Sequence, residues 1–131
     1  MIKLIIGNKG SGKTKKLIDQ VNVCVENSDG NVVCIEKEPK LTYDVSSKAR
    51  LLETETYLIN GHKAFYGFLA GICAGNYDVT DILVDATFKI VGREYEKLPQ
   101  LSEASDVNFY FTISCDKEDL PVEIFDYCEE L

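Results

Sequence analysis

An apolar run over residues 2–6 leads directly into a glycine-rich segment, and this junction constrains the fold more than any other feature. The segment 7–14 reads GNKGSGKT, which has the spacing G-x-x-x-x-G-K-[ST] of a phosphate-binding loop. Glycines let such a loop wrap an anion without Cβ clashes, and its backbone N–H groups then point inward. The pattern therefore predicts a buried strand, a phosphate-binding loop and a helix, in that order.

The loop and the helix after it are expected to supply distinct contacts to a nucleoside triphosphate. The N–H groups and the positive dipole end of the helix favour an anion. Lys13 is expected to reach the β- and γ-phosphates, and the Thr14 hydroxyl to take a coordination position on Mg²⁺. The expected nucleotide contacts are Gly7, Asn8, Lys9, Gly10, Ser11, Gly12, Lys13, Thr14 and Lys15.

Length, charge and cysteine usage limit the number of domains, the general partners and the cysteine chemistry that we expect. The chain has 131 residues, which suits one domain over residues 1–131. Its formal net charge of −8 disfavours nucleic acids and anionic membranes as general partners. The first apolar run is too short for a signal peptide, and no run approaches the length of a membrane span. The five cysteines lack C-x-x-C spacing, which predicts reduced thiols in the cytoplasm rather than a disulfide or zinc framework.

Apolar periodicity and turn residues predict an alternation of strands and helices. The expected strands cover residues 2–6, 32–35, 56–59, 81–85 and 107–114, and the expected helices cover 13–26, 62–74 and 119–130. Residues 42–52 suggest a loop and a short helix, residues 93–105 suggest part helix, and Gly75 suits a helix C-cap. Strands that are apolar on both faces predict a parallel sheet covered by helices.

Ligands of such sheets bind at the carboxyl ends of the strands, where this chain places several acidic side chains. Asp85 closes the apolar run 82–84 and suits the aspartate that orients Mg²⁺. Glu36 and Glu38 follow the second strand, and either carboxylate could polarise the water that attacks a γ-phosphate, with Glu38 preferred. His62, the only histidine, has no recognisable acid–base partner and is expected to be solvated or structural.

Hydroxyl groups and arginines provide further candidates. Thr112 and Ser114 end the last strong strand, where a hydroxyl could sense the γ-phosphate or simply bond to neighbouring backbone. Asp116 lies just beyond them. If an arginine of this chain stabilises the transferred phosphate, Arg93 is a better candidate than Arg50, because it follows Asp85 in the sequence.

The order and spacing of these segments resemble a pared-down RecA-type P-loop ATPase core. The resemblance rests on the loop 7–14, the run VVCIEKE at 32–38, the strand that ends in Asp85, and the strand that ends at residues 112–114. It implies an α/β, three-layer P-loop NTPase fold with a mostly parallel central sheet and a RecA-like strand arrangement. ATP and Mg²⁺ are the ligands that it implies.

The same resemblance implies roles for individual residues. The catalytic glutamate of the RecA family lies near the end of the strand after the first helix, which corresponds to Glu38, or to Glu36 if the register slips. Asp85 matches the Walker B aspartate, and Thr112 or Ser114 matches the polar sensor strand. With Lys13 on the phosphates, the expected catalytic set is Lys13, Glu38 and Asp85, and the expected metal ligands are Thr14 and Asp85.

Departures from the family pattern argue against several classes of P-loop protein. Residues 85–89 read DATFK, so no glutamate follows the aspartate, unlike in AAA+ proteins, helicases and secretion motors. Residues 86–106, where RecA-like recombinases keep DNA-binding loops, are too acidic for that role. The chain resembles the thymidine-kinase type more distantly, but the catalytic glutamate of that family also follows the aspartate directly, and its zinc-binding cysteine lobe is absent here.

Three functions remain open from the sequence. The first is a cytoplasmic ATPase with slow or partner-stimulated hydrolysis, in which a homo-oligomer or another protein completes the site. The second is a phosphotransferase for a small acceptor such as a nucleoside, with residues 86–106 as its lid or acceptor pocket. The third is a nucleotide-gated binding module without turnover. ATP is preferred over GTP because the chain lacks an Asn-Lys-x-Asp guanine motif.

Overall fold

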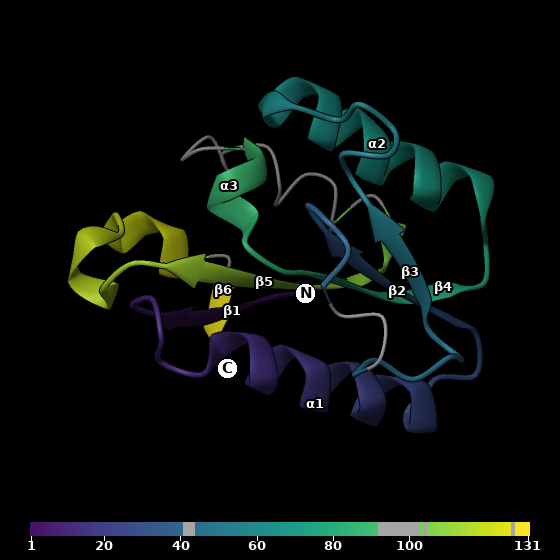
Figure 1. Ribbon diagram of the computed structural model, residues 1–131, viewed down its shortest axis with the longest axis horizontal. Helices are drawn as coiled ribbons and strands as arrows, with labels where there is room; N and C mark the ends of the chain where they lie inside the picture. The colour runs from purple at the N-terminus through teal and green to yellow at the C-terminus, as the bar shows by residue number, and fades with distance from the viewer. Residues whose placement is uncertain (41–43, 92–102, 104, 127) are drawn as a thin grey trace.

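The structure is a computed structural model that describes residues 1–40, 44–91, 103, 105–126 and 128–131. Its described strands form one six-stranded sheet in which every pairing between neighbours is parallel (Figure 1). The spatial order is β3-β2-β4-β5-β1-β6. The strands are β1 (Ile2–Gly7), β2 (Asn31–Glu36), β3 (Arg50–Glu53), β4 (Val79–Val84), β5 (Asn108–Ser114) and β6 (Cys128–Glu130). The predicted α/β class with a mostly parallel sheet is confirmed.

Helices cover both faces of the sheet. Figure 1 shows α1 (Lys13–Asn27) below the strands, and α2 (Gly61–Gly75) and α3 (Thr87–Val91) above them. The predicted helices 13–26 and 62–74 are therefore confirmed, with ends shifted by one residue. No helix in the described ranges is both long and apolar enough to cross a membrane.

Alternation of side chains along the strands builds two separate cores, because successive residues of a strand point to opposite faces. On β2, Val33 and Ile35 belong to the core shared with α2, whereas Val32 and Cys34 belong to the core shared with α1. The α1 side chains in the latter core are Leu17, Val21 and Cys24. Strands buried on both faces explain the continuous apolar runs in the sequence.

The predicted strand over residues 56–59 is wrong. These residues lie in turns, since the backbone N–H groups of Tyr57 and Ile59 both bond to the carbonyl of Thr54. Leu58 adopts a left-handed φ of 59° and is 87% exposed. The strand in this region is β3, which overlaps the end of the segment 42–52, for which the sequence suggests a loop and a short helix.

The predicted terminal helix over residues 119–130 is also wrong. Two short 3₁₀ helices, η1 (Lys117–Asp119) and η2 (Val122–Asp126), precede β6, which pairs with β1. Leu120 between them is extended, with φ −90° and ψ 144°. This is the conformation that the following Pro121 imposes, so a continuous helix is interrupted there.

Two smaller predictions have different outcomes. Gly75 is the last residue of α2 rather than its left-handed cap, because the chain leaves through Asn76 in an extended conformation with φ −150°. The Asn76 side-chain oxygen then accepts a hydrogen bond from the N–H of Asp78. The predicted partial helix over 93–105 lies almost wholly outside the described residues.

Candidate functional site

The carboxyl ends of the parallel strands meet at one edge of the sheet, and the predicted site residues lie there. The loop 8–12 follows β1, Asp85 follows β4, Ser114 ends β5 and Glu36 ends β2. Strand β5 lies between β1 and β4, so the glycine-rich loop and Asp85 approach each other across the end of β5. The topology therefore brings together residues from four strands.

Glycine is required in the loop for two different reasons. Gly10 and Gly12 both have φ of +86°, a left-handed conformation that L side chains rarely adopt. Gly7 is different: a Cβ added there would meet the Ser11 hydroxyl and lie 3.1 Å from the Ser11 Cβ, so the Ser11 side chain would have to shift. The glycine spacing thus follows from the backbone path of the loop.

The loop is held in place from both sides. The Lys13 ammonium donates a 3.1 Å hydrogen bond to the carbonyl of Asn8, and so folds back over the loop. The Asn8 side-chain amide donates a 2.5 Å hydrogen bond to the carboxylate of Asp116, beyond β5. Asp116, a candidate from sequence, is therefore an anchor of the loop in this structure.

The first turn of α1 is left available to an anion. Its N-cap residue is Gly12, no described side chain makes a capping hydrogen bond there, and the first turn contains no acidic residue. The unpaired N–H groups and the helix dipole both favour negative charge at this position. A phosphate group in the loop would satisfy them.

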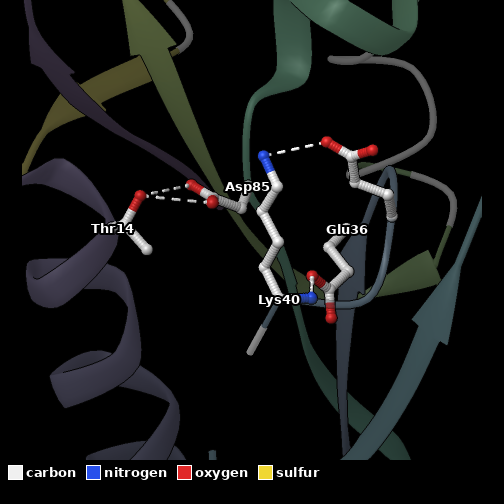
Figure 2. A network of polar contacts seen from close by, with 5 residues as sticks. Thr14, Glu36, Lys40 and Asp85 are labelled. Carbon is white, nitrogen blue, oxygen red and sulfur yellow. Dashed lines mark hydrogen bonds and ion pairs between the residues drawn. The ribbon is translucent and has the colours of Figure 1, made fainter. Parts of the chain in front are cut away.

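Asp85 connects α1 to β5 at the centre of the site. The Thr14 hydroxyl lies 3.2 Å and 3.4 Å from the two carboxylate oxygens of Asp85, and the Thr112 hydroxyl donates a 2.7 Å hydrogen bond to one of them. Figure 2 shows the Thr14 hydroxyl pointing directly at this carboxylate. The predicted pair Thr14 and Asp85 is thus in direct contact.

The pair offers oxygen atoms of the type that Mg²⁺ prefers. Among the residues that the structure describes, no three His, Cys, Asp or Glu side chains cluster as a metal site. Mg²⁺ is usually held in nucleotide sites by one or two protein oxygens together with phosphates and water. Thr14 and Asp85 could supply one or two such protein oxygens.

A pocket of about 340 Å³ opens over this edge of the sheet. It is lined by Lys9, Gly10, Lys13, Thr14, Glu36, Lys37, Glu38, Lys40, Asp85, Ala86, Lys89, Thr112 and Ser114. Lysines outnumber carboxylates in this lining, although the whole chain has a formal net charge of −8. The concentration of cations at one point of an acidic protein indicates an anionic ligand.

The two candidate glutamates have different environments in the pocket. Glu36 is 3% exposed, and its carboxylate accepts a 2.7 Å hydrogen bond from the backbone N–H of Lys40 (Figure 2). Glu38 lies in the loop after β2 and pairs with the Lys40 ammonium at 2.8 Å. That hydrogen bond and the positive charge lower the pKa of Glu38. Both carboxylates therefore line the pocket, but only Glu38 is solvent-accessible.

Some of the candidate residues from the sequence are not among the residues that line this pocket. Lys15 extends to Asp19 on the exposed side of α1. Arg50 lines a different pocket beside β3 and α2. His62 lies on the first turn of α2, and Arg93 lies outside the described residues.

Sequence reasoning missed Lys37, Lys40 and Lys89 as pocket residues. No motif marks them, because their positions depend on how the loop after β2 and the helix α3 fold over the strand ends.

All five cysteines are thiols rather than disulfides, as predicted.

Comparison of the chain with protein-family models and with curated proteins found no match in either.

Proposed function

We propose that this protein binds ATP with Mg²⁺ and hydrolyses it slowly, or faster when a partner completes the site. The single observation that carries the proposal is the contact between Thr14 and Asp85 within a lysine-lined pocket. A hydroxyl and a carboxylate, groups that can coordinate Mg²⁺, thus lie beside an uncapped, glycine-rich helix start, and this supports the proposal. Such a combination is suited to the phosphates of a nucleotide and to the metal that they carry.

Several residues of the pocket have separate roles in this proposal. The loop N–H groups and Lys13 bind and orient the phosphates, and Thr14 and Asp85 hold the metal. Mg²⁺, when bound, neutralises charge that develops on the phosphate oxygens. Thr112 keeps the Asp85 carboxylate turned toward Thr14 through its 2.7 Å hydrogen bond.

Glu38 is proposed to orient the attacking water. Its pKa is lowered by Lys40, so the carboxylate is ionised at neutral pH and accepts a hydrogen bond from water. Glu36 is the alternative, but its burial and its hydrogen bond to the backbone of Lys40 suit a structural role better.

The strand order supports a RecA-like P-loop arrangement. Strand β1 before the loop and strand β4 before Asp85 are separated by β5, which contributes Thr112. The end of β5, with the Thr112 hydroxyl, therefore lies between the phosphate-binding loop and the aspartate, which suits the proposed RecA-like arrangement. A homo-oligomer or another protein that adds a cation at the open side of the pocket fits the same proposal.

A specific observation also favours binding without turnover as a second candidate function. The residue after Asp85 is Ala86, which has a left-handed φ of 52° and carries no carboxylate into the pocket. If Glu38 cannot orient water, the protein would act as a nucleotide-gated binding module.

Phosphate release with Mg²⁺-ATP tests the proposal, using Glu38→Gln and a matched control. Glu55→Gln is the control, because Glu55 is an exposed glutamate in the turns after β3. We expect turnover in the wild type and in Glu55→Gln, and its loss in Glu38→Gln with ATP binding retained. Binding without turnover in every variant would favour the module, and release that depends on an added nucleoside would favour a phosphotransferase.

A further inference from the structure

The loop after β2 is fixed across the pocket by a buried carboxylate. Glu36, the last residue of β2, is 3% exposed and accepts a 2.7 Å hydrogen bond from the backbone N–H of Lys40. A buried backbone N–H or carboxyl oxygen is costly to leave without a partner, so this hydrogen bond favours one loop conformation. The backbone of Lys40 therefore has a defined position at the pocket wall.

The Lys40 side chain extends from this position into the pocket. Its ammonium pairs with Glu38 at 2.8 Å (Figure 2), and Lys40 lines the same pocket as Asp85. The two partners of this ion pair are 62% and 48% exposed. An ion pair with this much solvent access contributes little stability, so its cation can exchange partners readily.

Strand order places Lys40 opposite the phosphate-binding loop. Strands β5 and β4 lie between β1 and β2, which separates the two strand ends by three strand spacings, roughly 14 Å. Asp85 follows β4, which lies between these two strands, and Lys13, Thr14, Asp85 and Lys40 all line the same pocket. A phosphate chain that starts in the loop and passes the metal pair ends on the side of Lys40.

We propose that Lys40 is the contact to the terminal phosphate of a bound nucleoside triphosphate, and that it leaves Glu38 to make this contact. The inference rests on the proposed function and adds to it a residue that distinguishes a triphosphate from a diphosphate. In the pocket without a nucleotide, Glu38 holds the Lys40 ammonium. When a γ-phosphate arrives, the ammonium moves to it, and the Glu38 carboxylate is released toward the water beside the phosphate.

Two nucleotides and three variants test this exchange. A non-hydrolysable ATP analogue with a β,γ-imido bridge and ADP, each with Mg²⁺, are titrated calorimetrically into the wild type, Lys40→Met and Glu38→Gln. Lys63→Met is the control, because Lys63 is an exposed lysine on the first turn of α2 and does not line the pocket. Circular dichroism confirms that each variant is folded.

The expected result is a change in the preference between the two nucleotides. Lys40→Met should weaken binding of the ATP analogue about tenfold or more, since a charge-assisted contact is lost, and should change ADP binding less than about twofold. Glu38→Gln should tighten binding of the analogue, because the competing carboxylate is removed. Lys63→Met should bind both nucleotides like the wild type.

The outcomes separate this inference from the proposed function. If the wild type binds both nucleotides but Lys40→Met weakens them equally or not at all, Lys40 does not contact the terminal phosphate and the inference fails alone. If the wild type binds neither nucleotide, the proposed function fails and this inference fails with it.

Discussion

The Thr112 hydroxyl donates a 2.7 Å hydrogen bond to the Asp85 carboxylate and accepts another of 2.7 Å from the backbone N–H of Ala86. Thr112 is 1% exposed, so one buried oxygen connects the end of β5 to the turn that follows β4. One bond fixes the backbone N–H of Ala86, and the other fixes the Asp85 carboxylate that faces Thr14. A residue that resembles a phosphate sensor in the sequence is thus a positioning residue for the proposed metal site.

Thr112→Val should weaken Mg²⁺-dependent binding of ATP about tenfold, because loss of the hydroxyl frees the Asp85 carboxylate to rotate. It should also lower the free energy of unfolding by about 1–3 kcal/mol, since the Ala86 N–H loses its partner. Titration of ATP at several Mg²⁺ concentrations measures the first effect, and urea denaturation the second.

Thr80→Val is the matched control for that variant. The Thr80 hydroxyl donates to Asp81 at 2.8 Å near the start of β4, far from the strand ends that form the pocket. Its loss should reduce stability and leave the Mg²⁺ dependence unchanged. An equal loss of Mg²⁺ dependence in both variants would contradict a specific role for Thr112.

Asp85→Asn should remove most of the effect of Mg²⁺ on ATP binding, because an amide is a much weaker magnesium ligand than a carboxylate. Asp81→Asn is a suitable comparison, since Asp81 is a buried aspartate on β4, the strand that Asp85 follows, and it accepts hydrogen bonds from Thr80 and Asn108. That variant should change stability but not the metal dependence. Magnesium-dependent affinity that survives in Asp85→Asn would refute the proposed metal ligand.

Gly12→Ala should weaken ATP binding and destabilise the protein by about 1–2 kcal/mol, the cost of a side chain in the left-handed region. Gly12 has φ +86° at the start of α1, so relief of the strain would move the loop. Gly71→Ala in α2 meets no atom within 4 Å of the added Cβ, and alanine there should raise stability by up to about 1 kcal/mol. Thermal unfolding of both variants, with ATP titration, checks this contrast; similar behaviour of the two would contradict it.

Stability should fall as pH rises above about 9, partly through Cys34. Burial, followed by the nearby charges of Glu36 and Asp85, raises the pKa of this thiol from 9.0 to about 12. Between these values the unfolded thiol loses its proton while the folded thiol retains it. The unfolded state then binds fewer protons, and the free energy of unfolding decreases with pH.

Urea denaturation between pH 7 and pH 11 measures this dependence. Cys34→Ala should be less stable at pH 7, but its stability should decrease less steeply above pH 9, by up to about 1.4 kcal/mol per pH unit. Equal slopes for the variant and the wild type would show that Cys34 does not contribute.

Local patterns in the sequence predict the centre of the fold but not its edges. The segments β1, α1, β2, α2, β4 and β5 have clear apolar periodicity, and each is predicted to within two residues. The edge strands β3 and β6 are short, and β6 exists because it pairs with β1, where Cys128 lies opposite Ile2. A pairing between residues so far apart in the chain leaves no periodic signal in a three-residue strand.

The same distinction applies to the candidate site. Lys13, Thr14 and Asp85 are predictable because a motif or a strand end marks them, and the parallel topology brings them together. Lys40 and the contact between Asn8 and Asp116 are not predictable, since they depend on loop conformations that no local pattern determines. Glu38 is predictable as a pocket residue, but its ion pair with Lys40 is known only from the structure.

Titration of Mg²⁺-ATP into the wild type, Lys13→Ala and the exposed-site control Lys63→Ala tests the central claim most directly. We expect binding by the wild type and the control, and loss of at least about tenfold in affinity in Lys13→Ala, because a lysine that contacts the phosphates is removed. Binding that is unaffected by Lys13→Ala, or no binding by the wild type, would contradict the claim that this pocket holds a nucleoside triphosphate.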